Sequence, residues 1–124
     1  MKHLVIVLCL GLLGGAALAQ GQGDARQRGQ EVFEANCAQC HRSNGEGLPA
    51  TFPALNKNAF VLGDPKPVIA AVLNGLRGNL GRMPGWKDKL DDDQIAAVVT
   101  YLRQAWSNRA APVTPAMVAA MRTK

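Results

Sequence analysis

Residues 37–41 read Cys-Ala-Gln-Cys-His, which places two thiols and an imidazole next to one another in the chain. On one helical turn, two cysteines at this spacing can reach one edge of a porphyrin and add across its two vinyl groups. The histidine that follows is then carried under the metal, where its ring can bind as an axial ligand. The motif predicts one covalently attached haem c, with Cys37 and Cys40 as its anchors and His41 as the proximal iron ligand.

Three other interpretations of the motif compete with haem attachment. A structural zinc ion needs four ligands, and beyond the motif the chain offers only Cys9 and His3, both in a segment that we expect to be removed. A thioredoxin-like dithiol needs strands around the motif, and no alternating apolar pattern flanks residues 30–45. The third alternative is chance occurrence on a surface helix. An export signal and a downstream methionine, described below, favour haem.

The N-terminal residues 1–19 have the parts of a secretory signal peptide. Lys2 gives the positive start, residues 4–13 form an apolar run, and residues 17–19 read Ala-Leu-Ala, a small-x-small cleavage signal. This apolar run is too short to span a membrane, since a spanning helix needs about 20 apolar residues. We therefore expect a cleaved signal peptide and an exported protein, periplasmic or otherwise extracytoplasmic, without an integral membrane span. An uncleaved anchor and lipid attachment at Cys9 are the alternatives.

The expected mature chain, residues 20–124, has the size of one small domain, with residues 109–124 as a C-terminal extension. The whole sequence has 14 basic and 9 acidic side chains; removal of Lys2 with the signal leaves 13 basic ones and a formal charge of +4. The excess is small and dispersed, which argues against nucleic-acid binding. Both remaining cysteines belong to the haem motif, so we expect no disulfide.

Helix signals predict an all-α fold of about four to five helices around the haem. Asp24, Asp64 and Asp91 are candidate N-caps, and Asp91 with Gln94 forms a capping-box pattern. A glycine inside the first helix, Gly29, would let another helix approach closely. We expect no strands. After His41 we expect an ordered loop that packs along the haem. The predicted helices cover residues 24–36, 65–74, 91–106 and a short segment from 114 toward the end.

Few residues can be the second axial ligand, because the expected mature chain has no histidine besides His41. The candidates are Met83, Met117, Met121, a lysine or an open site. We expect Met83, since it stands in a loop that Pro84 restricts toward an extended backbone. Met117 and Met121 lie four residues apart in an amphipathic segment, where filling the core is the commoner role. Met/His ligation favours the ferrous state and leaves no open position for a substrate.

Over most of residues 24–106 the sequence resembles the class I c-type cytochromes. Four segments carry the resemblance: the Cys-x-x-Cys-His motif and the segments Phe52-Pro53-Ala54-Leu55, Met83-Pro84 and Val99-Thr100-Tyr101-Leu102.

The resemblance implies roles for single residues. Cys37 and Cys40 are implied as thioether anchors, with His41 as the proximal ligand and Met83 as the distal one. The Pro53 carbonyl is implied as the acceptor of a hydrogen bond from the His41 ring. A contact between the first and last main helices is also implied, through Gly29, Phe33 and Tyr101.

These observations predict a monomeric single-electron carrier that is not an enzyme. Its partners would be respiratory redox proteins, a terminal oxidase or a dehydrogenase, docking transiently at the haem edge. The basic residues that flank the ligand loops form either a positive docking rim or scattered solvated charge; they are Arg42, Arg82, Lys87 and Lys89. The alternatives are a haem subunit fixed in a dehydrogenase or oxidase complex, and a gas-binding or peroxidase-like protein with an open distal site.

Overall fold

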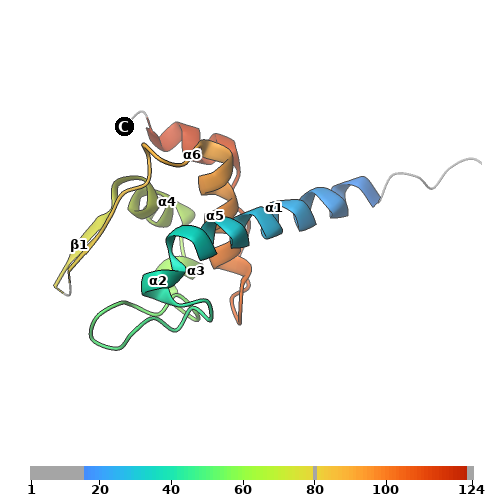
Figure 1. Cartoon of the computed structure of the whole chain (residues 1–124). Helices are drawn as coiled ribbons and strands as arrows, with labels where there is room; N and C mark the ends of the chain where they lie inside the picture. Colours follow the sequence, from blue (N-terminus) through green and yellow to red (C-terminus); the bar gives the residue numbers. More distant parts are fainter. Residues whose placement is uncertain (1–15, 80, 123–124) are drawn as a thin grey trace, which may run out of the picture.

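A computed structural model describes residues 16–79 and 81–122 (Figure 1). Its elements are α1 (Ala16–Asn36), α2 (Ala38–His41), α3 (Ala59–Leu62), α4 (Pro65–Asn74), β1 (Leu76–Gly78), β2 (Gly81–Met83), α5 (Asp92–Gln104) and α6 (Pro115–Arg122). The mainly helical architecture confirms the expected fold class. The described residues form six helices, and two of these, α2 and α3, are only four residues long.

The central packing contact is the crossing of α1 over α5 (Figure 1). A Cβ atom built on Gly29 would lie 2.7 Å from the Ala97 carbonyl carbon and 2.8 Å from the Tyr101 Cβ. One turn further along α1, the fully buried Phe33 packs its ring 5.4 Å from the ring of Tyr101, centroid to centroid. The predicted contact of Gly29, Phe33 and Tyr101 is therefore confirmed.

The first helix begins earlier than predicted. The sequence analysis placed its start at Asp24, whereas α1 begins at Ala16. Residues 16–19 are alanines and a leucine, which have high helix propensity, so the helix continues through them and Asp24 lies in its interior. The predicted cleavage point after residue 19 falls inside α1, and residues 1–15 of the predicted signal lie outside the described part of the chain.

The caps of α4 and α5 follow the prediction. The Asp64 side chain accepts a hydrogen bond from the Lys66 N–H, and a proline opens α4. At α5 the Asp91 carboxylate accepts from the Gln94 N–H at 2.8 Å, and the Gln94 side chain accepts from the Asp91 N–H at 3.0 Å. This capping box satisfies two backbone donors that the first turn of a helix leaves unpaired.

The expectation of no strands is wrong. β1 and β2 pair antiparallel, with Leu76 opposite Met83, Arg77 opposite Arg82 and Gly78 opposite Gly81. Each strand has three residues, too few to show the alternation by which a strand is recognised in a sequence, and its glycines indicated a loop. The two strands form a hairpin that extends from the end of α4 (Figure 1).

The C-terminal extension packs on the helices that precede it. Val118 of α6 is completely buried, and the helix contacts α5 and α4. Arg122 at its end donates to the Lys87 and Leu90 carbonyls and forms an ion pair with Asp92. Residues 109–122 therefore belong to the folded domain. Within residues 16–79 and 81–122, none of the helices combines the length and apolar character needed to cross a membrane.

We predict that Gly29→Ala lowers the free energy of unfolding, although alanine normally stabilises a helix by about 1 kcal/mol relative to glycine. The added methyl group would collide with α5, and such overpacking costs about 1–3 kcal/mol. Gly23→Ala is the matched control, because nothing lies within 4 Å of a Cβ at that position of the same helix. Denaturant unfolding of both variants measures the difference; equal stability changes would contradict the prediction.

Candidate haem site

The Cys-x-x-Cys-His motif forms a single helical turn directly after α1. The Cys37 N–H donates to the Phe33 carbonyl at 2.8 Å, and the His41 N–H donates to the Cys37 carbonyl at 2.9 Å. These bonds join α1 to α2 without an intervening loop. The position of α1 against α5 therefore sets the position of both cysteines and of the histidine.

The ring of His41 is held in one orientation by the chain. His41 is 8% exposed, and its Nδ1 lies 3.0 Å from the Pro53 carbonyl oxygen. A carbonyl can only accept, so Nδ1 carries a proton, and in the neutral ring the lone pair is then on Nε2. Nε2 has no hydrogen-bond partner among the described residues. This arrangement, with one nitrogen donating to a carbonyl, is typical of a histidine that binds a metal through the other.

Gly47 brings the Pro53 carbonyl against this turn, a feature that the sequence analysis missed. Its φ is +62°, and its N–H donates to the His41 carbonyl at 2.9 Å. A Cβ built on Gly47 would lie 2.6 Å from the Pro53 oxygen. Only glycine combines this backbone conformation with so close an approach.

The loop after α2 is also tied to the end of α5. The Trp106 Nε1–H donates to the Ser43 carbonyl at 2.9 Å, and a Cβ on Gly45 would lie 2.7 Å from the Trp106 ring. Asn108, which is completely buried, accepts from the Lys57 N–H at 2.7 Å and donates to the carbonyls of Leu55 and Leu102 at 3.0 and 2.7 Å. No local pattern marks this asparagine in the sequence, because two of its three partners, Leu55 and Lys57, are more than 50 residues away along the chain.

The two thiols differ in environment. Both are free, Cys40 being exposed and Cys37 half-buried. Burial raises the pKa of the Cys37 thiol to about 11, and the neighbouring Cys40 adds to the increase. Since the thiolate is the nucleophile, this burial lowers the reactivity of the Cys37 thiol toward alkylating reagents.

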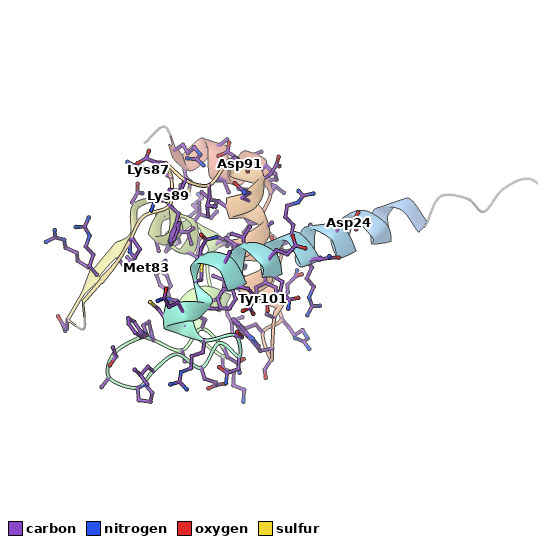
Figure 2. The ribbon with its side chains drawn as sticks, in the orientation of Figure 1. Asp24, Met83, Lys87, Lys89, Asp91 and Tyr101 are labelled. Atoms are coloured by element: carbon purple, nitrogen blue, oxygen red, sulfur yellow. The ribbon has the colours of Figure 1, made fainter. Side chains whose placement is uncertain are left out.

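Met83 stands at the end of β2, in half-buried contact with the hydrophobic core. The Trp86 N–H donates to the Val72 carbonyl at 2.9 Å and the Lys87 N–H to the Leu73 carbonyl at 3.1 Å, which fixes the chain after Met83 to α4. Figure 2 labels Met83 between the hairpin and α2. The other candidate methionines, Met117 and Met121, lie on α6 in contact with the core, as expected for core residues.

The base of the hairpin closes on a second glycine with positive φ. Gly75 has a φ of +79°, and the Met83 carbonyl lies so close to it that a side chain would collide. A Cβ built there would also lie 2.8 Å from the Gly85 N. Gly75 and Gly85 therefore allow the backbone around Met83 to lie close to the end of α4.

The residues present fit a covalently bound haem. Two free thiols on one turn, an imidazole with one nitrogen held by a carbonyl, and a thioether are the types of donor that a six-coordinate haem c takes. Three large apolar side chains of the described residues are also exposed: Leu48, Phe60 and Leu76. Fold and site together define a helical haem-binding domain of the c type.

Comparison with known proteins agrees with the assignment of a c-type haem-binding domain. The family model described as "Cytochrome C oxidase, cbb3-type, subunit III" matches residues 24–102. The chain therefore belongs to this family of c-type cytochrome domains, and it is a small class I cytochrome c that binds one haem c covalently. The match ends before the tail, so α6 lies outside it.

Individual relatives fall into two groups. The chain is 34% identical over 109 residues to cytochrome c-552 of Thermus thermophilus, covering 78% of this chain and 68% of that protein. It is 38% identical over 74 residues to cytochrome c6 of Leptolyngbya boryana, covering 60% and 85%. It is also 36% identical over 98 residues to the cytochrome c subunit of the quinone alcohol dehydrogenase of Gluconobacter oxydans, covering 73% of this chain but only 20% of that subunit.

We predict that Gly47→Ala disturbs the hydrogen bond between the His41 ring and Pro53. The methyl group must displace the Pro53 carbonyl, and a non-glycine residue at positive φ adds strain of about 1–3 kcal/mol. We expect reduced stability and a shifted His41 ring N–H signal in NMR spectra of the haem-loaded protein. Gly78→Ala is the control, since nothing lies within 4 Å of a Cβ there. An unchanged ring signal in Gly47→Ala would contradict the proposed positioning.

Proposed function

We propose that this c-type cytochrome is a one-electron carrier in which His41 and Met83 are the axial iron ligands and Cys37 and Cys40 the thioether anchors. The observation that carries the proposal is the His41 ring, fixed through Nδ1 on the Pro53 carbonyl with Nε2 left to bind iron. The cytochromes c-552 and c6 among its relatives support a carrier, as does the absence of a second histidine downstream of residue 41 that could act as an acid or base.

In this proposal the protein's task is to keep the ligand set unchanged between two oxidation states. Bound haem c supplies an iron that alternates between ferric and ferrous. The Pro53 carbonyl raises the basicity of the His41 ring and prevents its rotation. The backbone bonds from Trp86 and Lys87 to α4 hold the Met83 loop in place. A preorganised site of this kind needs little rearrangement when an electron arrives.

The predicted signal peptide supports transport across the cytoplasmic membrane, and we propose that the protein works in the periplasm, or otherwise outside the cytoplasm, in a respiratory chain. Electron partners would be a dehydrogenase on one side and a terminal oxidase on the other. Relatives named as a dehydrogenase cytochrome subunit and as the cbb3-type oxidase subunit FixP of Azorhizobium caulinodans support both partner classes.

A subunit role is the second candidate, and the same relatives favour it. The chain spans only about a fifth to a quarter of the length of the dehydrogenase cytochrome subunits among its relatives. Gel filtration of the haem-loaded protein with and without detergent-solubilised membranes of its source separates the two roles. A free carrier elutes as a monomer and accepts electrons from several donors, whereas a fixed subunit co-elutes with one complex.

We predict that Met83→Ala opens the distal side of the iron. The reduced variant should bind carbon monoxide rapidly, lose the near-infrared sulfur-to-iron band in its oxidised form and show a lower reduction potential, because a soft sulfur ligand favours the ferrous state. Absorption spectra with and without carbon monoxide, and a redox titration, measure these changes.

Met117→Ala is the matched control for this experiment, because it removes a core methionine outside the Met83 loop. It should lower the free energy of unfolding by no more than the about 2–5 kcal/mol that removing a buried methionine side chain costs. The absorption spectrum of the variant should be that of the wild type. If the wild-type reduced protein itself bound carbon monoxide rapidly, Met83 would not be a ligand, and the gas-binding or peroxidase-like alternative would take the place of the carrier.

A further inference from the structure

The chain between Met83 and α5 is a short connecting segment, residues 84–91, that contains no helix or strand. On one side it is held by α4, because the N–H groups of Trp86 and Lys87 donate to carbonyls in the last turn of that helix. Met83 lies only three residues before Trp86, and Pro84 restricts the backbone between them. The position of the connecting segment therefore determines where Met83 lies.

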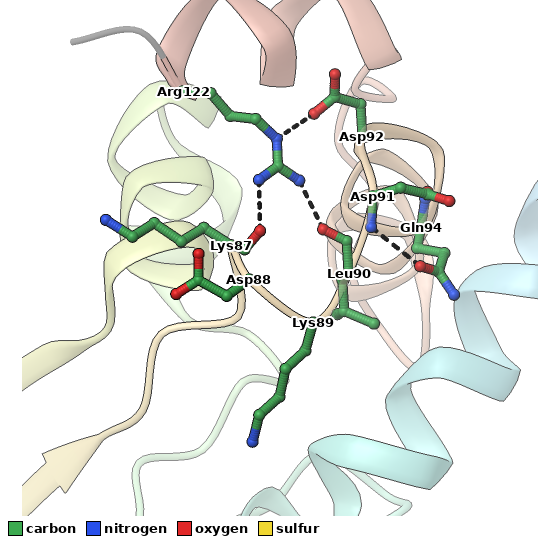
Figure 3. A pocket seen from close by; sticks show the side chains of 8 residues that line it. All are labelled: Lys87, Asp88, Lys89, Leu90, Asp91, Asp92, Gln94 and Arg122. Atoms are coloured by element: carbon green, nitrogen blue, oxygen red, sulfur yellow. Dashed lines mark hydrogen bonds and ion pairs between the residues drawn. The ribbon is translucent and has the colours of Figure 1, made fainter.

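The carbonyl groups of the connecting segment are held by a different helix, through Arg122 at the end of α6 (Figure 3). The Arg122 Nη1 donates to the Lys87 carbonyl at 2.7 Å, and its Nη2 donates to the Leu90 carbonyl at 2.6 Å. Its Nε forms the ion pair with Asp92 in the first turn of α5. Within residues 16–79 and 81–122, Arg122 is the only donor to either carbonyl oxygen. One guanidinium therefore joins two points of the segment to the start of α5.

This contact depends on the shape of the arginine side chain. A guanidinium carries its donors in a rigid planar fork and can serve three acceptors at once, whereas a lysine ammonium is a compact point charge. The side chains of Arg122 and Asp92 are 26% and 34% exposed, so their ion pair is partly shielded from water. Hydrogen bonds from a charged donor are also about twice as strong as neutral ones. Arg122 therefore restrains the connecting segment more than neutral side-chain contacts would.

Water can reach the place where Arg122 binds. The residue lines an open pocket of about 490 Å³ together with residues 87–92 and Gln94 (Figure 3). In a variant without the guanidinium, solvent can bind the Lys87 and Leu90 carbonyls, so that no buried polar group is left unpaired. Such a variant should fold, and it should lose only the restraint on the connecting segment.

We propose that Arg122 is a positioning residue for Met83, which it keeps on the iron by clamping the connecting segment. The inference rests on the proposed function, since it takes Met83 as the distal ligand. The family match ends at residue 102, so the clamp belongs to the tail and not to the matched domain. A segment with few bonds opens locally at a lower free energy than the whole fold. Removal of the clamp should therefore release Met83 more often while the helices stay intact.

The test measures how fast added imidazole replaces the Met83 sulfur in the oxidised, haem-loaded protein. The bond from iron to sulfur breaks, a bond from iron to an imidazole nitrogen forms, and no electron moves. At saturating imidazole the rate is that of Met83 dissociation. Arg122→Gln should raise this rate about tenfold or more, the factor expected from the loss of one charge-assisted hydrogen bond. Arg122→Lys should raise it almost as much, because an ammonium cannot serve all three acceptors.

Arg109→Gln is the matched control for this experiment. Arg109 also donates to two backbone carbonyls, those of Trp106 and Asn108, but in the segment that follows α5. Its replacement removes the same charge and the same number of carbonyl bonds, and the imidazole rate should stay that of the wild type. An equal increase in this control, or a wild-type rate in either Arg122 variant, overturns the clamp.

Heating separates positioning of Met83 from a general effect on stability. In Arg122→Gln the near-infrared sulfur-to-iron band should disappear at a lower temperature than in the wild type, whereas the helical circular dichroism should be lost at about the same temperature. If both midpoints fall together, Arg122 only stabilises the fold and the clamp is overturned. If the oxidised wild type lacks the band, the ligand assignment of Met83 fails and the clamp fails with it. A band in the wild type with an unchanged rate in Arg122→Gln overturns the clamp alone.

Discussion

The close approach of α1 to α5 at Gly29 is the contact on which the haem site depends. Because α1 passes into the Cys-x-x-Cys-His turn without a loop, the depth at which Phe33 packs on Tyr101 also sets the position of His41. Trp106, just beyond α5, packs on Phe33 and Tyr101 with ring centroids 5.5 and 5.8 Å away and also binds the Ser43 carbonyl. The helix α5 therefore positions the motif through its contact with α1. Trp106, just beyond the end of α5, positions the loop that follows the motif.

The loop between α2 and α3 has little regular structure, so its shape depends on hydrogen bonds to fixed partners. Gly47 bonds back to His41, and Asn108 binds backbone groups on Leu55, Lys57 and Leu102. Each such bond contributes about 1 kcal/mol net, whereas leaving its buried partner unpaired costs about 1–3 kcal/mol. The asparagine lies in the segment after α5, beyond the family match, so the tail helps to hold the loop that orients the His41 ring.

Local patterns in the sequence were sufficient to predict the helix caps at Asp64 and Asp91, since both partners of each cap lie within a few residues. The Cys-x-x-Cys-His motif was recognisable for the same reason, and the site roles assigned to it remain predictions. What escaped prediction depends on distant partners or on very short elements. The three-residue strands of the hairpin are too short to show a period, and Asn108 has no local signature. The start of α1 was misplaced because Asp24 has the chemistry of a cap but lies inside the helix.

Arginine has two contrasting roles in this fold, and the difference lies in which acceptors come within reach. Arg103 is only 4% exposed, yet its Nε binds the Ala111 carbonyl at 2.8 Å and its Nη1 binds those of Val61 and Gly63 at 2.7 and 2.8 Å. A buried guanidinium is tolerated there because carbonyl dipoles replace its hydration, and in return it connects α3 and the tail to α5. The hairpin places Arg77 and Arg82 where no carbonyl or carboxylate of the described chain reaches them. Their charge is therefore left exposed to solvent, whereas that of Arg103 is used within the fold.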